Sequence, residues 1–179
     1  VLMPLHGQIT GSNDKATGII RSADDGKTWG DFSLIAHGER NYWEAGIRRL
    51  PNGELLAMNR NEPGPWMWQC RSEDNGYAWS EPENSGMAGD VGELLVLQSG
   101  NIMCGYRSQA PGTSDTRASI SRDNGHTWTD EIVLDPNGGD RGYTSSVQLP
   151  DGRILVLNYS TVDGLCQIRS RMLREEDFD

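Results

Sequence analysis

An eight-residue pattern occurs three times in this chain of 179 residues, and it constrains the fold more than any other feature. The pattern is Ser-x-Asp-x-Gly-x-(Thr/Ala)-Trp, and its copies occupy residues 22–29, 72–79 and 121–128. The copies start 50 and 49 residues apart, and a nearly constant period in this range is typical of proteins built from structural repeats. We therefore expect a repeat architecture in which each copy marks the same place in successive units.

Each position of the pattern has a local reason. Asp-x-Gly or Asn-Gly between strand-like runs is a hairpin signal, because Gly adopts a positive φ without steric cost. The Asp and Ser side chains can accept hydrogen bonds from backbone N–H groups of their own turn, and the Trp returns a large apolar surface to the layer beneath. A calcium loop is the alternative, but its alternating oxygen ligands and terminal bidentate Glu are absent from the sequence. The pattern predicts a structural turn, and the sequence indicates no metal and no cofactor.

A second repeated signal has a similar period. Short turns such as Leu-Pro-Asn-Gly begin at Leu50, Leu97 and Leu149, which are 47 and 52 residues apart. Strand-like runs flank these turns, and the runs group into three, four, four and three strands with no helical period. The 22 Gly residues also suit a turn-rich all-β protein. We therefore predict a β-propeller of antiparallel four-stranded blades, in which the first and last blades are incomplete.

The eight-residue pattern resembles the Asp box of the sialidase superfamily, whose propellers have six blades. The resemblance covers residues 1–179 and implies that they correspond to blades 3 to 6, with the N-terminal third of the fold missing. A first unit that begins at its second strand agrees with truncation, and a last unit of three strands agrees with a C-terminus that awaits an N-terminal strand. Two alternatives stay open: two chains associate through unpaired blade edges, or a small closed propeller forms.

The net charge limits the classes of partner that the chain can bind. The chain has 16 Lys and Arg against 26 Asp and Glu, a formal net charge of −10, which argues against nucleic acid or an anionic membrane as a partner.

Cys70, Cys104 and Cys166 have neither a disulfide framework nor metal-ligand spacing, and each lies in an apolar strand-like run, so we expect buried free thiols. No signal peptide or membrane-spanning run is visible, but the chain begins at Val1 within an apolar run. The compartment therefore stays open, secretion or a periplasm included.

Equivalent positions of the repeats carry different residues, and this suggests a site built on a constant frame. Six residues before the turn leucines, where the first strand of each blade lines the channel of a propeller, the units carry Glu44, Val91 and Tyr143. Ten residues after the turn leucines they carry Arg60, Arg107 and Tyr159, with His6 at the corresponding place of the first unit. Simple solvation of charged strand ends is the plainer alternative.

The sialidase resemblance assigns roles to two of these residues. Residues 42–60 look like the segment that opens the fourth blade of sialidases. Residues 142–155 look like their Tyr-Ser motif and the turn that follows it, with Thr144 in place of the usual Ser. The resemblance implies that Tyr143 is the catalytic nucleophile and that Glu44 takes its proton. A Tyr hydroxyl has an ordinary pKa of about 10 and needs such a base.

The resemblance also implies an arginine cluster for the carboxylate of the substrate, since a guanidinium group can form two charge-assisted bonds. Arg60 matches the second arginine of the family. For the third, Arg107 fits the repeat register and Arg117 fits the family's order, so both stay candidates. The first arginine and the acid/base Asp have no counterpart, which predicts little or no activity for this chain alone. Asp115 and Asp140 lie just before strands and can reach the mouth of the channel.

We therefore expect an enzyme of sialidase type that releases terminal sialic acid from glycoconjugates with retention. Its partner would be a sialylated or other acidic glycan. Two other functions stay open. One is a related glycosidase that acts on another sugar acid, and the other is a non-catalytic Asp-box propeller that binds glycan or protein.

Overall fold

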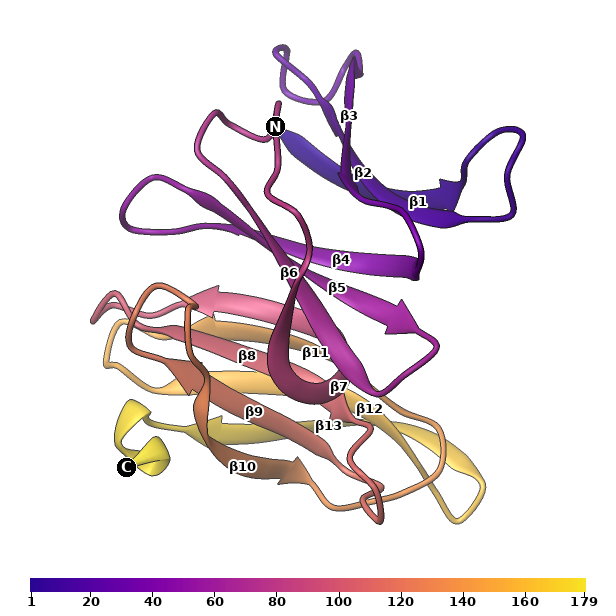
Figure 1. Cartoon of the computed structure of the whole chain (residues 1–179). Coiled ribbons are helices and arrows are strands. Elements are labelled where there is room, and N and C mark those ends of the chain that lie inside the picture. The colour runs from indigo at the N-terminus through magenta and orange to yellow at the C-terminus, as the bar shows by residue number, and fades with distance from the viewer.

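The computed structural model describes residues 1–179, apart from the side chain of Asp130. The regular structure is antiparallel β-sheet apart from one short helix, and the sheet of the first three strands lies at the end of the molecule opposite the C-terminus (Figure 1). Its strands are β1 (Leu2–Gln8), β2 (Lys15–Arg21), β3 (Gly30–Ala36), β4 (Asn41–Arg49), β5 (Leu55–Glu62), β6 (Trp66–Ser72), β7 (Glu83–Val96), β8 (Ile102–Ser108), β9 (Thr116–Ser121), β10 (Thr129–Asp135), β11 (Arg141–Gln148), β12 (Ile154–Val162) and β13 (Leu165–Leu173). A short 3₁₀ helix, η1 (Glu175–Phe178), follows β13.

Strand pairing divides the chain into four blades. The first blade is β1–β2–β3 and the fourth is β11–β12–β13, while β4 to β10 form one continuous seven-stranded sheet. Strand β7 belongs to two blades, because Ala88 pairs with Trp66 of β6 and the next residue, Gly89, pairs with Ser108 of β8. The second blade is therefore β4–β5–β6 with the start of β7, and the third is the rest of β7 with β8–β9–β10. The predicted all-β propeller and its three, four, four and three strands are confirmed.

The junction inside β7 differs from the expectation. A count of four strands in each of the two middle blades implies a break between the last strand of one and the first strand of the next, but residues 83–96 are one uninterrupted strand. No turn signal separates the two halves, so the chain passes from one blade to the next in extended conformation. Asp90 therefore lies within a strand at the crossing between two blades, and it is buried there.

The three Asp boxes form the predicted turns. In the first box the backbone N–H of Gly26 donates to Oγ of Ser22 at 2.7 Å, and that of Thr28 donates to Oδ1 of Asp24 at 2.8 Å. The indole N–H of Trp29 closes the turn on the carbonyl of Gly26 at 3.0 Å. The second box repeats this indole bond, whereas Trp128 of the third box donates to the side chain of Gln69 instead.

Apolar layers between neighbouring blades form the core. The layer between the second and third blades contains the buried residues Leu56, Met58, Met67, Leu94, Cys104 and Tyr106. Similar layers lie on either side of it, against the first and fourth blades. The inner strands β4 and β7 approach so closely that a Cβ atom on Gly46 would lie 2.1 Å from the carbonyl oxygen of Gly92. This close approach fixes the inner strands relative to each other, and the candidate site is built on them.

One expectation about the cysteines is corrected. Cys70 and Cys104 are buried free thiols, as predicted, but Cys166 is exposed. It lies on β13, which pairs with β12 and whose residues are exposed up to Met172 in the described part of the chain. The charged tail ends in η1, whose Phe178 is only 1% exposed and packs on the core of the last two blades.

Candidate active site

The inner strands of the last three blades share an unusual backbone device. Each has a β-bulge, between Trp43 and Gly46 in β4, between Asp90 and Glu93 in β7, and between Gly142 and Ser145 in β11. One residue in each bulge has a positive φ, and these residues are Glu44 (44°), Val91 (54°) and Tyr143 (49°). A positive φ is rare for such side chains and rarest for a β-branched residue. The same backbone conformation therefore recurs at one position of each repeat, where it sets the direction of the side chain.

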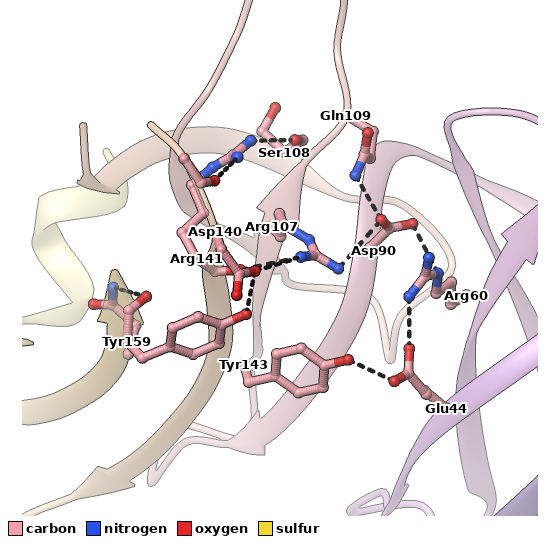
Figure 2. Close-up of polar contacts among 12 residues, drawn as sticks. Glu44, Arg60, Asp90, Arg107, Ser108, Gln109, Asp140, Arg141, Tyr143 and Tyr159 are labelled. Atoms are coloured by element: carbon pink, nitrogen blue, oxygen red, sulfur yellow. Dashed lines mark hydrogen bonds and ion pairs between the residues drawn. The ribbon is translucent and has the colours of Figure 1, made fainter. Parts of the chain in front are cut away.

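Two of these bulge residues meet. The hydroxyl of Tyr143 donates a hydrogen bond of 2.5 Å to Oε1 of Glu44. The other oxygen of Glu44 accepts a hydrogen bond of 3.0 Å from Nη1 of Arg60 (Figure 2). Arg60 pairs with Trp43, the residue before Glu44, across β4 and β5. Both carboxylate oxygens of Glu44 are thus held, one by a phenol and one by a guanidinium group.

The shared proton stays on the phenol. Burial opposes ionisation of Glu44, but hydrogen bonds from Tyr143 and Arg60 outweigh it and lower the pKa of Glu44 below its ordinary value. Burial and the hydrogen bond to the Glu44 carboxylate both raise the pKa of Tyr143. The pair therefore consists of an ionised carboxylate and a neutral hydroxyl at neutral pH. Glu44 is placed to accept the proton when the phenolic oxygen forms a bond.

A network of carboxylates surrounds the two arginines. Besides Glu44, Arg60 forms ion pairs with Glu62 at 2.6 Å and with Asp90 at 3.6 Å. Arg107 forms ion pairs of 3.7 Å with Asp90 and with Asp140, and its guanidinium carbon lies 5.8 Å from the centre of the Tyr143 ring. Figure 2 shows Asp90 between the two guanidinium groups.

A second tyrosine completes the cluster. The rings of Tyr143 and Tyr159 are stacked with their centres 5.9 Å apart. The Tyr159 hydroxyl donates to Asp140 at 2.7 Å, and burial together with this hydrogen bond raises the pKa of Tyr159 to about 12. The repeat register predicts a place for Tyr159 in the site, and the sequence predicts Asp140 near the mouth of the channel. The sequence does not single out Asp90 or Glu62. A signal for Asp90 is that it directly precedes Val91, the position equivalent to Glu44 and Tyr143.

The predicted site residues are only partly brought together. Glu44, Arg60, Arg107 and Tyr143 lie in one cluster. Arg117 does not reach it, because its guanidinium group donates to Asp115 at 2.8 and 3.1 Å and to Glu131 of β10 at 2.7 Å. Of the two candidates for the third arginine, Arg107 is therefore the one beside Tyr143.

His6 lies at the margin of the cluster. Its ring packs edge-on against that of Trp43, with centres 5.6 Å apart, and Trp43 directly precedes Glu44. No group of three or more His, Cys, Asp or Glu side chains among the described residues could hold a metal ion. No helix in the described part of the chain is long and apolar enough to cross a membrane.

Comparison with known proteins assigns the chain to a family. The family described as "BNR repeat-like domain" matches residues 1–156. A solved protein of unknown function from Dyadobacter fermentans DSM 18053 is 29% identical, with a TM-score of 0.81 over 96% of this chain and 49% of that one. No curated protein matches the chain significantly.

Two solved glycosidases share the fold at lower identity. A Hadza microbial sialidase, Hz136, is 14% identical with a TM-score of 0.74, over 97% of this chain and 42% of its own. An α-L-arabinanase from Penicillium chrysogenum is 17% identical with a TM-score of 0.66, over 98% of this chain and 63% of its own. The chain thus spans about half or less of the length of the first solved structures that it matches. It belongs to the BNR repeat-like domain family and has the β-propeller fold of sialidase-like glycosidases.

Proposed function

We propose that the cluster around Glu44 and Tyr143 is the nucleophile half of the active site of a retaining glycoside hydrolase. The observation that carries the proposal is the 2.5 Å hydrogen bond from the Tyr143 hydroxyl to Glu44. A nucleophile within hydrogen-bond reach of a base, with the base oriented by a third group, is the arrangement that activates a weak nucleophile. Arg60 is the third group here, because it holds the second oxygen of Glu44.

The reaction would proceed in two displacements. The phenolic oxygen of Tyr143 bonds to the anomeric carbon as the bond to the leaving group breaks, and its proton passes to Glu44. Water then attacks the anomeric carbon and gives up one proton to solvent, the tyrosine oxygen leaves, and Glu44 returns the stored proton to that oxygen. Two inversions give net retention. The residues assigned here supply the nucleophile and its base but no acid for the first leaving group, so an aglycone that departs as a stable anion suits this chain best.

Two classes of sugar fit different parts of the cluster. Arg60 and Arg107 flank the Glu44–Tyr143 pair and favour a sugar acid such as sialic acid as the substrate, because their positive charges can bind its carboxylate. The carboxylates that already pair with these arginines favour an uncharged sugar as the substrate, because they neutralise the positive charge that a sugar acid would need. The fold relatives include both kinds of protein, since one is called a sialidase and another is an arabinanase solved with arabinobiose.

A covalent trap tests the nucleophile without requiring the missing acid. Glycosyl fluorides with a second fluorine beside the anomeric carbon have a good leaving group and form slowly hydrolysed adducts. We would use a carboxylate-bearing 3-fluorosialyl fluoride and an uncharged 2-deoxy-2-fluoroarabinosyl fluoride, and locate adducts by peptide mass spectrometry. We expect an adduct on Tyr143 with at least one reagent, and none in Tyr143→Phe.

Tyr159→Phe is the matched control, because Tyr159 stacks on Tyr143 and also donates to a carboxylate. It should still be labelled on Tyr143. An adduct on any other residue would assign the nucleophile elsewhere. Glycan binding without an adduct would favour the non-catalytic propeller. Turnover of a fluorogenic sialoside that is lost in Tyr143→Phe would establish sialidase activity directly and overturn the expectation that this chain alone is inactive.

A further inference from the structure

Asp90 occupies a position that the proposed reaction does not use. It lies in β7 at the crossing between the second and third blades, directly before the bulge residue Val91, and is only 6% exposed. Its neighbour across the sheet is Arg107. Burial of a carboxylate is unfavourable unless the carboxylate is paired, so groups of opposite charge are expected around Asp90.

The carboxylate of Asp90 bridges the two arginines of the site. Its Oδ1 lies 3.6 Å from Nε of Arg60, and its Oδ2 lies 3.7 Å from Nη2 of Arg107. The side-chain amide of Gln109 donates to Oδ2 at 2.5 Å. A carboxylate between two guanidinium groups is the arrangement that a bound sugar acid would otherwise provide.

The charge of the cluster opposes a further anion. Four carboxylates, Glu44, Glu62, Asp90 and Asp140, form ion pairs with two guanidinium groups, those of Arg60 and Arg107. A third arginine, Arg141, directs its N–H groups to the backbone carbonyls of Gly139 and Ser108. The negative charges of this cluster therefore outnumber the positive ones, and the whole chain has a net charge of −10.

We propose that Asp90 takes the place of a substrate carboxylate on the arginine pair, so that the site accepts an uncharged sugar and rejects a sugar acid. This rests on the proposed glycosidase function of the same cluster. The outer carboxylates, Glu62 and Asp140, have side chains that are 49% and 74% exposed. Carboxylates accept hydrogen bonds from hydroxyl groups, so they suit a sugar that presents hydroxyls.

A different role for Asp90 makes the opposite prediction. If Asp90 only held the two arginines in position for an incoming carboxylate, its removal would loosen them and weaken the binding of a sugar acid. If it occupies the place of that carboxylate, its removal leaves two guanidinium groups with one partner fewer, and binding of a sugar acid strengthens. The sign of the change therefore separates the two roles.

The experiment measures binding by calorimetry in wild type, Asp90→Asn and Asp90→Glu. The acidic probe is 2,3-didehydro-2-deoxy-N-acetylneuraminic acid, and the uncharged probes are a panel of disaccharides that includes arabinobiose. We expect wild type and Asp90→Glu to bind an uncharged probe more tightly than the acid. We expect Asp90→Asn to bind the acid about tenfold more tightly than wild type does, because one negative charge is removed. Its affinity for the uncharged probe should change less than threefold.

Asp115→Asn is the matched control, since Asp115 pairs with Arg117 away from the cluster, and it should leave both affinities unchanged. The proposal is overturned if Asp90→Asn fails to strengthen binding of the acid, or if wild type prefers the acid to every uncharged probe. Melting curves show whether each variant is folded, and Asp90→Glu keeps the charge if Asp90→Asn does not fold. Failure of the glycosidase proposal is seen separately, as absence of a Tyr143 adduct, and does not alter these affinities.

Discussion

The hydroxyl of Tyr143 and the carboxylate of Glu44 lie 2.5 Å apart, although 99 residues separate them in the chain. Each residue occupies the same position of its own repeat, in the bulge of an inner strand and with a positive φ. A repeated backbone device thus turns two side chains from different blades toward each other. Every prediction below depends on this arrangement or on the frame that holds it.

Glu44→Gln should slow labelling of Tyr143 by the fluorinated reagents about 10²- to 10⁴-fold, the range usual for loss of a general base. The amide keeps the shape of the side chain but cannot take the phenolic proton. Rates of adduct formation from intact-protein mass spectra measure the effect. Glu62→Gln is the control, because Glu62 pairs with Arg60 and has no hydrogen bond to Tyr143. Equal losses in the two variants would indicate a general effect of charge.

The labelling rate should depend on pH through Glu44. Its pKa lies below the ordinary value of 4.5, so the base is ionised at neutral pH and the rate should fall only as the pH drops through that lowered pKa. Arg60→Gln removes a hydrogen bond and a positive charge that lower the pKa of Glu44, so the fall should begin at a higher pH. Arg107→Gln should leave the midpoint in place. A midpoint that is unchanged in Arg60→Gln would contradict the assignment of Glu44 as the base.

The box aspartates should contribute stability that acid removes. In Asp123 burial opposes ionisation, but hydrogen bonds from Thr127 and Ser121 outweigh it and lower the pKa from 3.8 to about 2. A lowered folded-state pKa stabilises the fold above the unfolded value, and this contribution is lost as the pH falls toward 2. Asp123→Asn should destabilise the protein at pH 7 by about 1 kcal/mol, as expected for weakened hydrogen bonds. The difference from wild type should shrink on acidification in urea melts from pH 7 to pH 2.

Asp74→Asn provides the comparison for this prediction. Asp74 lies at the same place of the second box, but Ala78 stands where the third box has a Thr, so one hydroxyl partner is missing. Its substitution should destabilise the protein less than Asp123→Asn does. A larger loss at Asp74 would mean that the hydroxyl bond does not account for the difference between the boxes.

The backbone conformation of Val91 should destabilise the folded protein. It is a β-branched residue with a φ of 54°, whereas the equivalent positions carry Glu44 and Tyr143. Left-handed backbone costs roughly 1–2 kcal/mol for ordinary residues and is better tolerated by Asn. Val91→Asn should therefore raise the free energy of unfolding by about 1 kcal/mol. Val96→Asn, in the extended part of β7 and packed against the core, should lower it.

Periodicity within the sequence determined the architecture. Because the Asp box and the leucine turn depend only on local backbone geometry and on the side chains of a few adjacent residues, their spacing predicted the blades and the strand count, both of which the fold confirms. The same register predicted which inner-strand positions are equivalent, and so named Glu44, Tyr143, Arg60 and Arg107 together. The thiols of Cys70 and Cys104 followed from their apolar strands.

The tertiary structure decided which of these residues meet and what charge they share. The choice between Arg107 and Arg117 depends on which guanidinium group lies beside Tyr143, and this is set by blade packing rather than by neighbours in sequence. Asp90 carries no motif, because its carboxylate becomes buried between two arginines only where β7 passes between two blades. Cys70 and Cys104 are buried in the apolar layers between blades, whereas Cys166 on β13 is exposed, so tertiary packing rather than the local apolar run decides whether a thiol is buried. Local patterns fix turns and strands, whereas the electrostatics of a site come from side chains that are brought together over long sequence distances.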